Sequence, residues 1–205
     1  YKQALLKTVR QPGTPVRQQG DVVSALAAST TTVEAEYYAP HLAHASMEPP
    51  ASVASVTAEF GEIWAPSQDP QSLIPMVEKI TGLKPEQIRI NVTLLGGAFG
   101  RKSKCDFVEE AVLLSKMLGA PVLVQWSRED DIRHDYYHSV SAQSLSAGLD
   151  ENGVPTSWRH RLAYPSIMST FDPSVKQAGA MGTGMVALNV PYAIPNFSVE
   201  TGEAE

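Results

Sequence analysis

The residues best suited to chemistry lie in a glycine-rich segment, LLGGAFGRKSKCDF, at positions 94–107. An alternating apolar run precedes it and a helix-like run follows, so its glycines fall where a strand gives way to a helix. Backbone N–H groups at such a turn bind anions, because no side chain keeps the ligand at a distance. The segment is therefore either a ligand-binding loop or a tight turn that only lets the helix pack on the strand.

The two common nucleotide-binding patterns do not fit this loop. A Walker loop has four residues between its glycines and a Lys directly after the second. Here three residues separate Gly96 from Gly100, and Arg101 precedes Lys102. The fingerprint G-x-G-x-x-G cannot be aligned with GGAFG either. The spacing thus argues against nucleotide hydrolysis and nicotinamide binding.

Two further segments carry polar side chains in suggestive positions. Gln68, in WAPSQDPQ, lies at a strand end just before a helix, where side chains are commonly presented to a ligand, although a lone amide there more often caps the helix or faces solvent. His41, His44 and Glu48 share the loop HLAHASMEPP. Their spacing matches no zinc signature, so we expect hydrogen-bonded histidines in a rigid turn rather than a metal site.

The run REDDIRHDYYH, at positions 128–138, concentrates charged and aromatic side chains. Such density is compatible with an acid–base site, but a salt-bridged connector is the preferred interpretation. Cys105 is the single cysteine, which excludes an internal disulfide and every multi-cysteine metal pattern. It lies at a predicted helix start, where a thiol pKa can fall, although packing is the commoner role of a lone cysteine.

Periodicity predicts the elements that position these residues. Residues 1–31 are predicted to be a turn-rich connector without a core, containing one or two helical turns. From Thr32 onward β patterns begin, and we expect antiparallel strands on either side of the loop HLAHASMEPP. The predicted elements after this connector are strands at 31–39, 51–58 and 60–66, a helix at 70–81 after an Asp69 cap, a strand at 88–95, a helix at 106–118, a buried strand at 121–126 and a hairpin turning at 151–153. The chain from position 165 onward is predicted to be mostly loops.

Composition narrows the functional class. The 205 residues are 43% hydrophobic and 19% charged, as in a globular protein with a real core. The net charge of -6 and the pI near 5.4 argue against nucleic-acid binding, which needs clustered basic residues. No run of eighteen apolar residues is present.

In combination, HASMEPP, WAPSQDPQ, NVTLLGGAFGRKSKCDFVEEAVLLSK and REDDIRHDYYHSVSAQ closely resemble the large, molybdenum-binding subunit of the xanthine oxidase family. The chain is most similar to the branch of isoquinoline 1-oxidoreductase beta subunits, which also includes membrane-associated bacterial aldehyde dehydrogenases. The resemblance runs from about Gln11 onward. It depends on the order of Gln68, the glycine loop and the charged run, because GGxFG alone is a weak motif.

The resemblance implies an α+β fold with a mixed sheet, in which residues 32–205 are part of a molybdopterin-binding domain. It implies a molybdopterin cofactor, usually the cytosine dinucleotide form, and oxidation of an N-heterocycle or aldehyde with water as oxygen source. A small subunit with two [2Fe-2S] clusters would carry the electrons to an acceptor such as a cytochrome. By position, Gln68 matches a glutamine that hydrogen-bonds an oxo ligand of molybdenum. The matching cofactor loop comprises Gly96, Gly97, Ala98, Phe99, Gly100 and Arg101.

Two departures from the family pattern limit what is expected. Ala98 replaces the third glycine of a common GGGFG loop, and Ser103 replaces a glutamate of the xanthine-oxidising members, which disfavours purine oxidation. The family's catalytic glutamate would lie beyond Glu205 and its substrate-access domain before Tyr1. We therefore expect a piece of a longer subunit that is inactive alone, with no catalytic residue of its own. Relatives are often exported, so a periplasmic or membrane-associated location stays open.

Two rival functions remain at this point. One is a non-catalytic binding or assembly module that retains the fold but has lost the chemistry. The other is a phosphate-binding domain of unrelated ancestry, which depends on the glycine loop alone.

Overall fold

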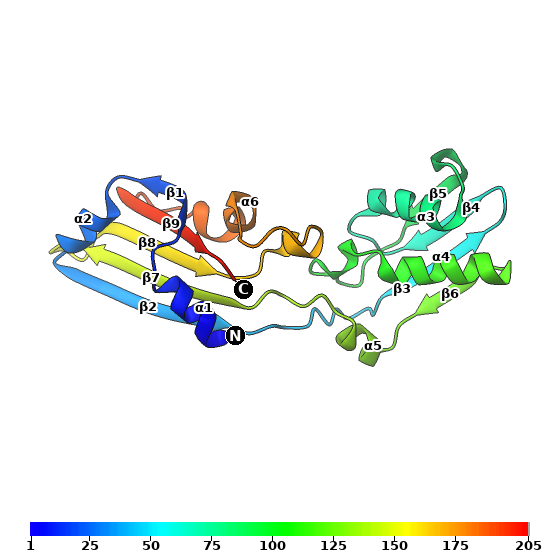
Figure 1. Cartoon of the computed structure of the whole chain (residues 1–205), viewed down its shortest axis with the longest axis horizontal. Coiled ribbons are helices and arrows are strands. Elements are labelled where there is room, and N and C mark those ends of the chain that lie inside the picture. Colours follow the sequence, from blue (N-terminus) through cyan, green and yellow to red (C-terminus); the bar gives the residue numbers. More distant parts are fainter. Residues whose placement is uncertain (205) are drawn as a thin grey trace. The chain divides into compact units, whose positions relative to one another are not determined.

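The computed structural model describes residues 1–204, the side chains of 185 and 186 excepted, and the chain divides into two compact units (Figure 1). One unit combines Tyr1–Leu42 with His138–Glu205, and the other is the continuous segment Ala43–Tyr137. Each unit has its own sheet, helices and core. Within residues 1–204 no helix is long and apolar enough to cross a bilayer.

The discontinuous unit is built on a five-stranded mixed sheet with the order β1-β9-β8-β7-β2. Its strand pairs are antiparallel except β8 with β9, which are parallel. The elements of this unit are α1 (Lys2–Val9), β1 (Thr14–Gln19), α2 (Val22–Ala27), β2 (Thr31–Ala39), β7 (Ser141–Leu149), β8 (Pro155–Ala163), η4 (Ile167–Thr170), α6 (Ala180–Thr183), η5 (Gly184–Leu188) and β9 (Asn196–Gly202).

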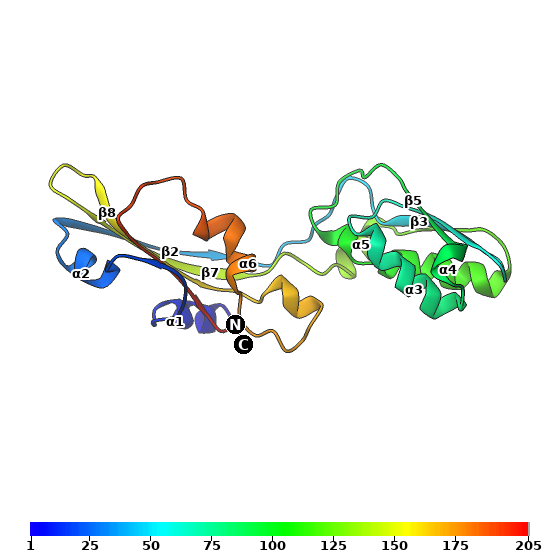
Figure 2. The same cartoon turned by 90° about the horizontal axis from the view of Figure 1, so that it is seen from above.

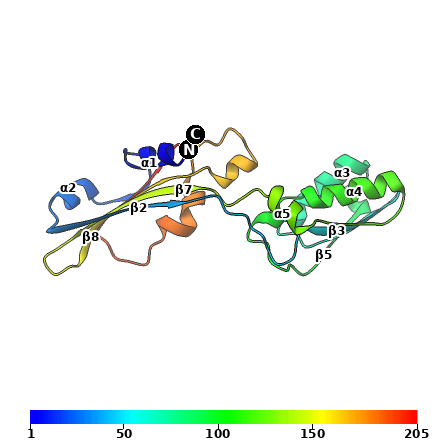
Figure 3. The same cartoon turned by 90° about the horizontal axis from the view of Figure 1, so that it is seen from below.

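Both faces of this sheet are partly covered, because α1 and α6 lie on opposite sides of it (Figures 2 and 3). Leu5 and Val9 of α1 pack on Ala142 and Ala163, whose side chains share one face. The opposite face has a second cluster, which includes Leu162, Ala187, Ile194, Phe197 and Val199. Burial of these apolar side chains is the main stabilising contribution in this unit.

The continuous unit has a four-stranded mixed sheet with the order β5-β4-β3-β6, and α3 and α4 cover the same face of it (Figures 2 and 3). Its elements are β3 (Ala51–Val56), β4 (Gly61–Ala65), η1 (Pro70–Ser72), α3 (Leu73–Thr81), η2 (Pro85–Gln87), β5 (Ile88–Val92), η3 (Arg101–Ser103), α4 (Asp106–Leu118), β6 (Val122–Gln125) and α5 (Arg128–Arg133). Alternate residues of β3 and β4 are buried, because one face of the sheet meets the helices. The core joins strand residues Ala54, Val56, Ile63 and Ala65 to helix residues Leu73, Val77, Phe107, Val108, Ala111 and Val112.

The sequence predicted correctly the strands β2 to β8 and the helices α3 and α4. The α+β class with mixed sheets is confirmed. The helix at 106–118 ends at Gly119, which adopts a left-handed conformation, and the hairpin turns at 151–153 with Gly153 at a φ of 78°. The helix at 70–81 forms with a 3-10 first turn, in which the Asp69 side chain makes no capping hydrogen bond.

Four expectations were wrong, each because tertiary pairing overrode a local pattern. Residues 1–31 are no coreless connector, since α1 supplies core residues and β1 pairs with β9. The strands on either side of residues 40–50 do not pair with each other, because β2 pairs with β7 whereas β3 pairs with β4 and β6. The strand β6 is an edge strand with Leu123 63% exposed, and the supposedly looped end of the chain contains β9.

Candidate functional site

The glycine loop follows β5 in the continuous unit, and both of its ends are fixed by side chains. At the first end, the Gly96 N–H donates to Glu48 Oε2 at 3.1 Å, while Glu48 N–H donates to the Gly96 carbonyl at 3.0 Å. At the second end, the Gly100 N–H donates to Gln68 Oε1 at 3.0 Å. The Gln68 N–H in turn donates to the Lys102 carbonyl at 2.9 Å. The loop therefore has a defined shape without any ligand.

Between these anchors, three consecutive backbone N–H groups point to no internal acceptor. Within residues 1–204, the N–H groups of Gly97, Ala98 and Phe99 donate no hydrogen bond. Gly97, Phe99 and Gly100 have left-handed φ values of 95°, 56° and 107°, so the backbone turns sharply here, and backbone turns of this kind form anion-binding concavities in other proteins. Phe99 is not a glycine, so its conformation is strained, as is common at binding sites. The loop is thus a preformed set of neutral hydrogen-bond donors.

Gln68 adds a further donor beside this set. Because its Oε1 accepts from Gly100, its Nε2 is left to donate outward, and the residue is exposed. A neutral amide and three backbone N–H groups suit an oxygen ligand whose charge is already balanced elsewhere. The structure therefore places Gln68 beside the loop Gly96–Gly100, and the binding of a cofactor by these residues stays a prediction.

Arg101 is positioned differently from its neighbours in the loop. Its side chain is fully buried, and it donates two hydrogen bonds to the carboxylate of Asp106 at 2.8 and 2.9 Å. The guanidinium lies 5.2 Å from the ring centres of both Trp126 and Tyr136, a cation–π arrangement. Its Nε lies 3.3 Å from Asp135 Oδ1. The Arg101 side chain is paired with acidic residues inside the unit, so Arg101 contributes only its backbone to the loop.

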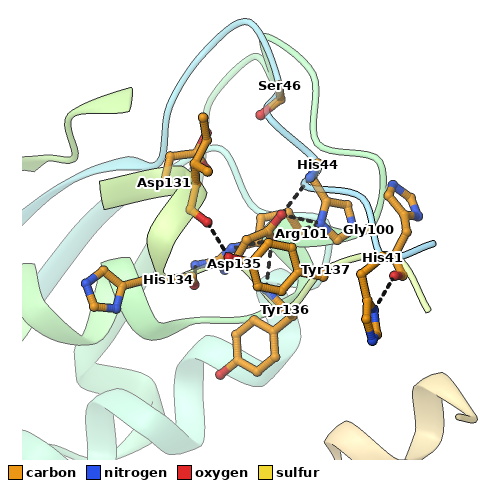
Figure 4. Close-up of polar contacts among 12 residues, drawn as sticks. His41, His44, Ser46, Gly100, Arg101, Asp131, His134, Asp135, Tyr136 and Tyr137 are labelled. Carbon is orange, nitrogen blue, oxygen red and sulfur yellow. Dashed lines mark hydrogen bonds and ion pairs between the residues drawn. The ribbon is translucent and has the colours of Figure 1, made fainter. Parts of the chain in front are cut away.

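Asp135 connects the Arg101 guanidinium to His44 in the loop HLAHASMEPP (Figure 4). Its buried carboxylate accepts from the backbone N–H of His44 at 2.6 Å, from the His44 ring Nδ1 at 2.8 Å and from the N–H of Tyr136 at 2.8 Å. The run at 128–138 is thus the salt-bridged connector that the sequence suggested; most of its residues are exposed, but Asp131 and the side chain of Asp135 are buried. Nothing in the sequence indicated that Asp135 would be buried among the charges of this run.

The side chains first considered for a metal go to separate partners. His41 Nδ1 lies 3.0 Å from the carbonyl of His138, His44 is held by Asp135, and Glu48 binds the glycine loop. Across the described part of the chain, no three His, Cys, Asp or Glu side chains form a metal-binding group. Burial, followed by the nearby Glu109 carboxylate, raises the pKa of Cys105 above its ordinary value, so the sequence-based idea of a lowered thiol pKa was wrong.

Sequence reasoning missed the part played by Glu48 and Lys102 at this loop. Lys102 is fully buried, and its ammonium donates to Glu48 Oε2. Burial raises the pKa of Glu48, but the hydrogen bonds from Lys102 and Gly96 outweigh it, and the net pKa lies below the usual range. The carboxylate is therefore ionised at neutral pH. Fifty-four residues separate the two partners, so no local pattern could reveal the pair.

The fold therefore combines two units with mixed sheets, and the site offers backbone and amide donors rather than charged side chains. The chain belongs to the molybdopterin cofactor-binding domain family, whose model matches residues 8–203. This match covers both units and confirms the family that the motifs indicated.

Curated relatives and solved structures agree with this membership. The chain is 28% identical over 151 residues to one subunit of the nicotinate dehydrogenase of Pseudomonas putida, covering 74% of the chain and 13% of the relative. It is 29% identical over 155 residues to the beta subunit of isoquinoline 1-oxidoreductase of Brevundimonas diminuta, covering 72% and 20%. The chain thus spans a fifth or less of the length of these relatives.

Two solved structures show the same fold at low sequence identity. The aldehyde oxidoreductase of Desulfovibrio gigas matches with a TM-score of 0.71 and 18% identity over 93% of this chain and 22% of that one. Quinoline 2-oxidoreductase of Pseudomonas putida 86 matches with a TM-score of 0.70 and 20% identity over 95% and 26%. Both cover the two units of the present chain.

Proposed function

We propose that Gln68 and the loop Gly96–Gly100 form part of a molybdenum-cofactor site in a hydroxylase that oxidises an N-heterocycle or an aldehyde, with water as the oxygen source. The observation that carries this proposal is the row of unsatisfied N–H groups at Gly97, Ala98 and Phe99 beside the Gln68 amide. Family membership supports it independently. The relatives are named for nicotinate and isoquinoline, which supports the substrate class.

The residues present fit such a cofactor. Oxo and phosphate oxygens are acceptors, and the site offers neutral donors fixed in advance, which favours binding because no ordering cost remains. Gln68 would donate from Nε2 while its Oε1 keeps Gly100 in place. The exposed ring of Phe99, 68% accessible, would shield the bound group from water. When bound, the cofactor supplies the redox chemistry that none of these side chains can perform.

Arg101 contributes to this site by holding the end of the loop in place rather than by contacting a ligand with its side chain. Its backbone N–H donates to the carbonyl of Ala98 at 3.0 Å, which closes the loop, while its guanidinium is held by Asp106 and Asp135. The finer parts of the proposal come from the family resemblance: a cytosine dinucleotide form of the cofactor, a small subunit with two [2Fe-2S] clusters, and an acceptor such as a cytochrome. Both curated relatives are named as subunits, which supports an assembly of several chains.

The test compares the substitution of Gln68 with that of a neighbouring glutamine, Gln71. The protein would be produced from its complete gene together with its small subunit, as wild type, Gln68→Ala and Gln71→Ala. Gln71 is an exposed glutamine three residues from Gln68 that makes no side-chain hydrogen bond within the described residues, so it is a matched control. Molybdenum is measured by mass spectrometry, pterin by fluorescence after oxidation, and turnover with an N-heterocycle and an aldehyde.

We expect molybdenum and pterin in the wild type, and a loss of activity or metal of roughly 10–100-fold in Gln68→Ala but not in Gln71→Ala. A wild type without molybdenum would favour the non-catalytic module instead. Unchanged activity and metal in Gln68→Ala would remove Gln68 from the site.

A further inference from the structure

The glycine loop lies on a second segment, residues 44–48, which the proposed function has not yet used. A Cβ built on Gly96 would lie 2.5 Å from Glu48 Cβ, and one on Gly97 would lie 3.2 Å from Ser46 Cβ. Alternate residues of the segment thus run beneath the loop. The glycines at 96 and 97 are required by this close approach, whether or not a ligand is present.

The charged run at 128–135 holds this segment in place. Asp135 accepts from the backbone and ring of His44, and Arg128 donates to the carbonyl of Met47 at 3.1 Å and also to that of Ser46. Arg128 is itself paired with the buried carboxylate of Asp131. Two separate points therefore fix the segment, so it is a rigid base for the loop.

The side chain of Glu48 forms a hydrogen bond with the loop. Its Oε2 accepts from the Gly96 N–H and from Lys102 Nζ, and its backbone N–H donates to the Gly96 carbonyl. Because Lys102 is fully buried, the pair also balances a charge that would otherwise be costly. Glu48 thus has two separable roles: it balances the Lys102 charge, and it provides an acceptor that sets the position of Gly96.

We propose that Glu48 is a positioning residue for the cofactor loop, and that its carboxylate oxygen, by fixing Gly96, keeps the N–H groups of Gly97, Ala98 and Phe99 aligned before a ligand arrives. This inference rests on the proposed function for the ligand, but the alignment itself is a property of the chain. Gln68 fixes the other end, so loss of the Glu48 carboxylate would loosen the loop at Gly96 alone, where the backbone bond from residue 48 to the Gly96 carbonyl would remain.

Two double variants separate the acceptor from the charge. Glu48→Gln with Lys102→Met removes both charges and keeps an acceptor for the Gly96 N–H, whereas Glu48→Met with Lys102→Met removes both charges and the acceptor. Both are made in the protein from the complete gene. Three quantities are measured: the thermal midpoint, amide hydrogen exchange of the peptides that cover residues 94–100 in cofactor-free protein, and the molybdenum and pterin content after purification.

We expect similar midpoints for the two double variants. Among the amides at 94–100, that of Gly96 loses its acceptor, so its exchange is expected to be about tenfold faster in the Met/Met variant than in the Gln/Met variant, with cofactor retention reduced to a similar extent. Equal exchange in the two double variants would overturn the inference. If both exchanged equally and faster than the wild type, the charge pair and not the acceptor would position the loop. If the wild type holds no molybdenum, the proposed function fails while the exchange comparison still decides the role of Glu48.

A single substitution tests the same inference without altering the charges, should a double variant not fold. Gly96→Ala leaves Glu48 and Lys102 in place but puts a Cβ at 2.5 Å from Glu48 Cβ, so the loop must move away. We expect faster exchange at 94–100 and lost cofactor. Gly179→Ala is the control, because a Cβ there meets nothing within 4 Å and, as at Gly96, no left-handed φ strains the new side chain. If exchange at 94–100 in Gly96→Ala were as slow as in the wild type, the inference would also be overturned.

Discussion

Buried charges near the loop are tolerated because each has partners with good geometry. The Arg101 cation combines a bidentate pair with Asp106, two aromatic faces and a nearby Asp135. Removing one member of such a network is costly, since the others stay buried without compensation. The residues that surround the loop therefore behave as one unit rather than as independent contacts.

The first prediction concerns the carboxylate at the centre of this network. Asp135→Ala leaves Arg101 and His44 without their shared partner, and we expect it to lower the free energy of unfolding by about 3–5 kcal/mol. Glu129→Ala, an exposed acidic residue in the same run, should change it by less than about 0.5 kcal/mol. Urea unfolding of both variants measures the difference, and equal stabilities would contradict the network.

The second prediction concerns pH and the other unit. Burial lowers the pKa of His160 from 6.5 to about 4, and its ring Nε2 lies 3.0 Å from Gln143 Oε1. The unfolded chain takes up a proton below pH 6.5 that the folded protein accepts only near pH 4. This contribution to stability is therefore complete above pH 6.5 and is lost as the pH falls toward 4, by up to about 3 kcal/mol.

Urea unfolding at several pH values checks this expectation. His160→Gln cannot titrate, so the stability of the wild type relative to this variant should fall between pH 7 and pH 4. A difference that does not depend on pH would show that His160 carries no such linkage.

At the scale of elements, the helix α4 is joined to the sheet by a hydroxyl as well as by its apolar face. Ser115 is fully buried; its Oγ accepts from the Val56 N–H at 2.9 Å and donates to the Ala120 carbonyl at 2.8 Å. One side chain thus satisfies the end of β3 and the turn after α4. The Val56 N–H is buried and needs such a partner, because no water reaches it.

The third prediction tests that connection. Ser115→Ala leaves the buried Val56 N–H and the Ala120 carbonyl without this partner, so we expect a loss of about 1–3 kcal/mol in the free energy of unfolding. Ser55→Ala on β3 is the control, since this partly buried serine makes no side-chain hydrogen bond within residues 1–204, and its effect should be within about 0.5 kcal/mol. A Ser115→Ala protein as stable as the control would show that the two groups find other partners.

At the scale of the whole molecule, each unit draws its core from its own residues. The core of the continuous unit uses positions between 54 and 112, and the two clusters of the other unit use positions outside 43–137. The His138 N–H donates to the Leu42 carbonyl at 2.8 Å, so the chain leaves and re-enters the discontinuous unit at paired positions. Compact segments with separate cores can fold alone.

The fourth prediction follows from this arrangement. Residues 43–137 produced alone should unfold cooperatively in urea, and residues 1–42 joined to 138–205 by a short glycine-serine linker should do the same. Val112→Asp, which places a charge in the core of the continuous unit, should abolish the transition of the 43–137 segment only. Gradual unfolding of either unmodified segment would show that the units depend on each other.

The sequence by itself determined the elements with strong local signals. The helix at 106–118, its glycine stop and the hairpin at 151–153 depend on spacings of a few residues, which local sterics decide. It also indicated the family and the place of Gln68 and the glycine loop, because these motifs are short and ordered along the chain.

Tertiary structure alone decided the sheet partners and the anchors of the loop. The pairing of β2 with β7, the insertion of β9 between β1 and β8, and the ion pair of Glu48 with Lys102 all join residues far apart in sequence. Such contacts depend on how distant segments pack together in each unit, and a local sequence pattern does not show which distant segments will meet. The glycine loop could thus be located from the sequence, but its fixed shape and its unsatisfied donors became visible only in the fold.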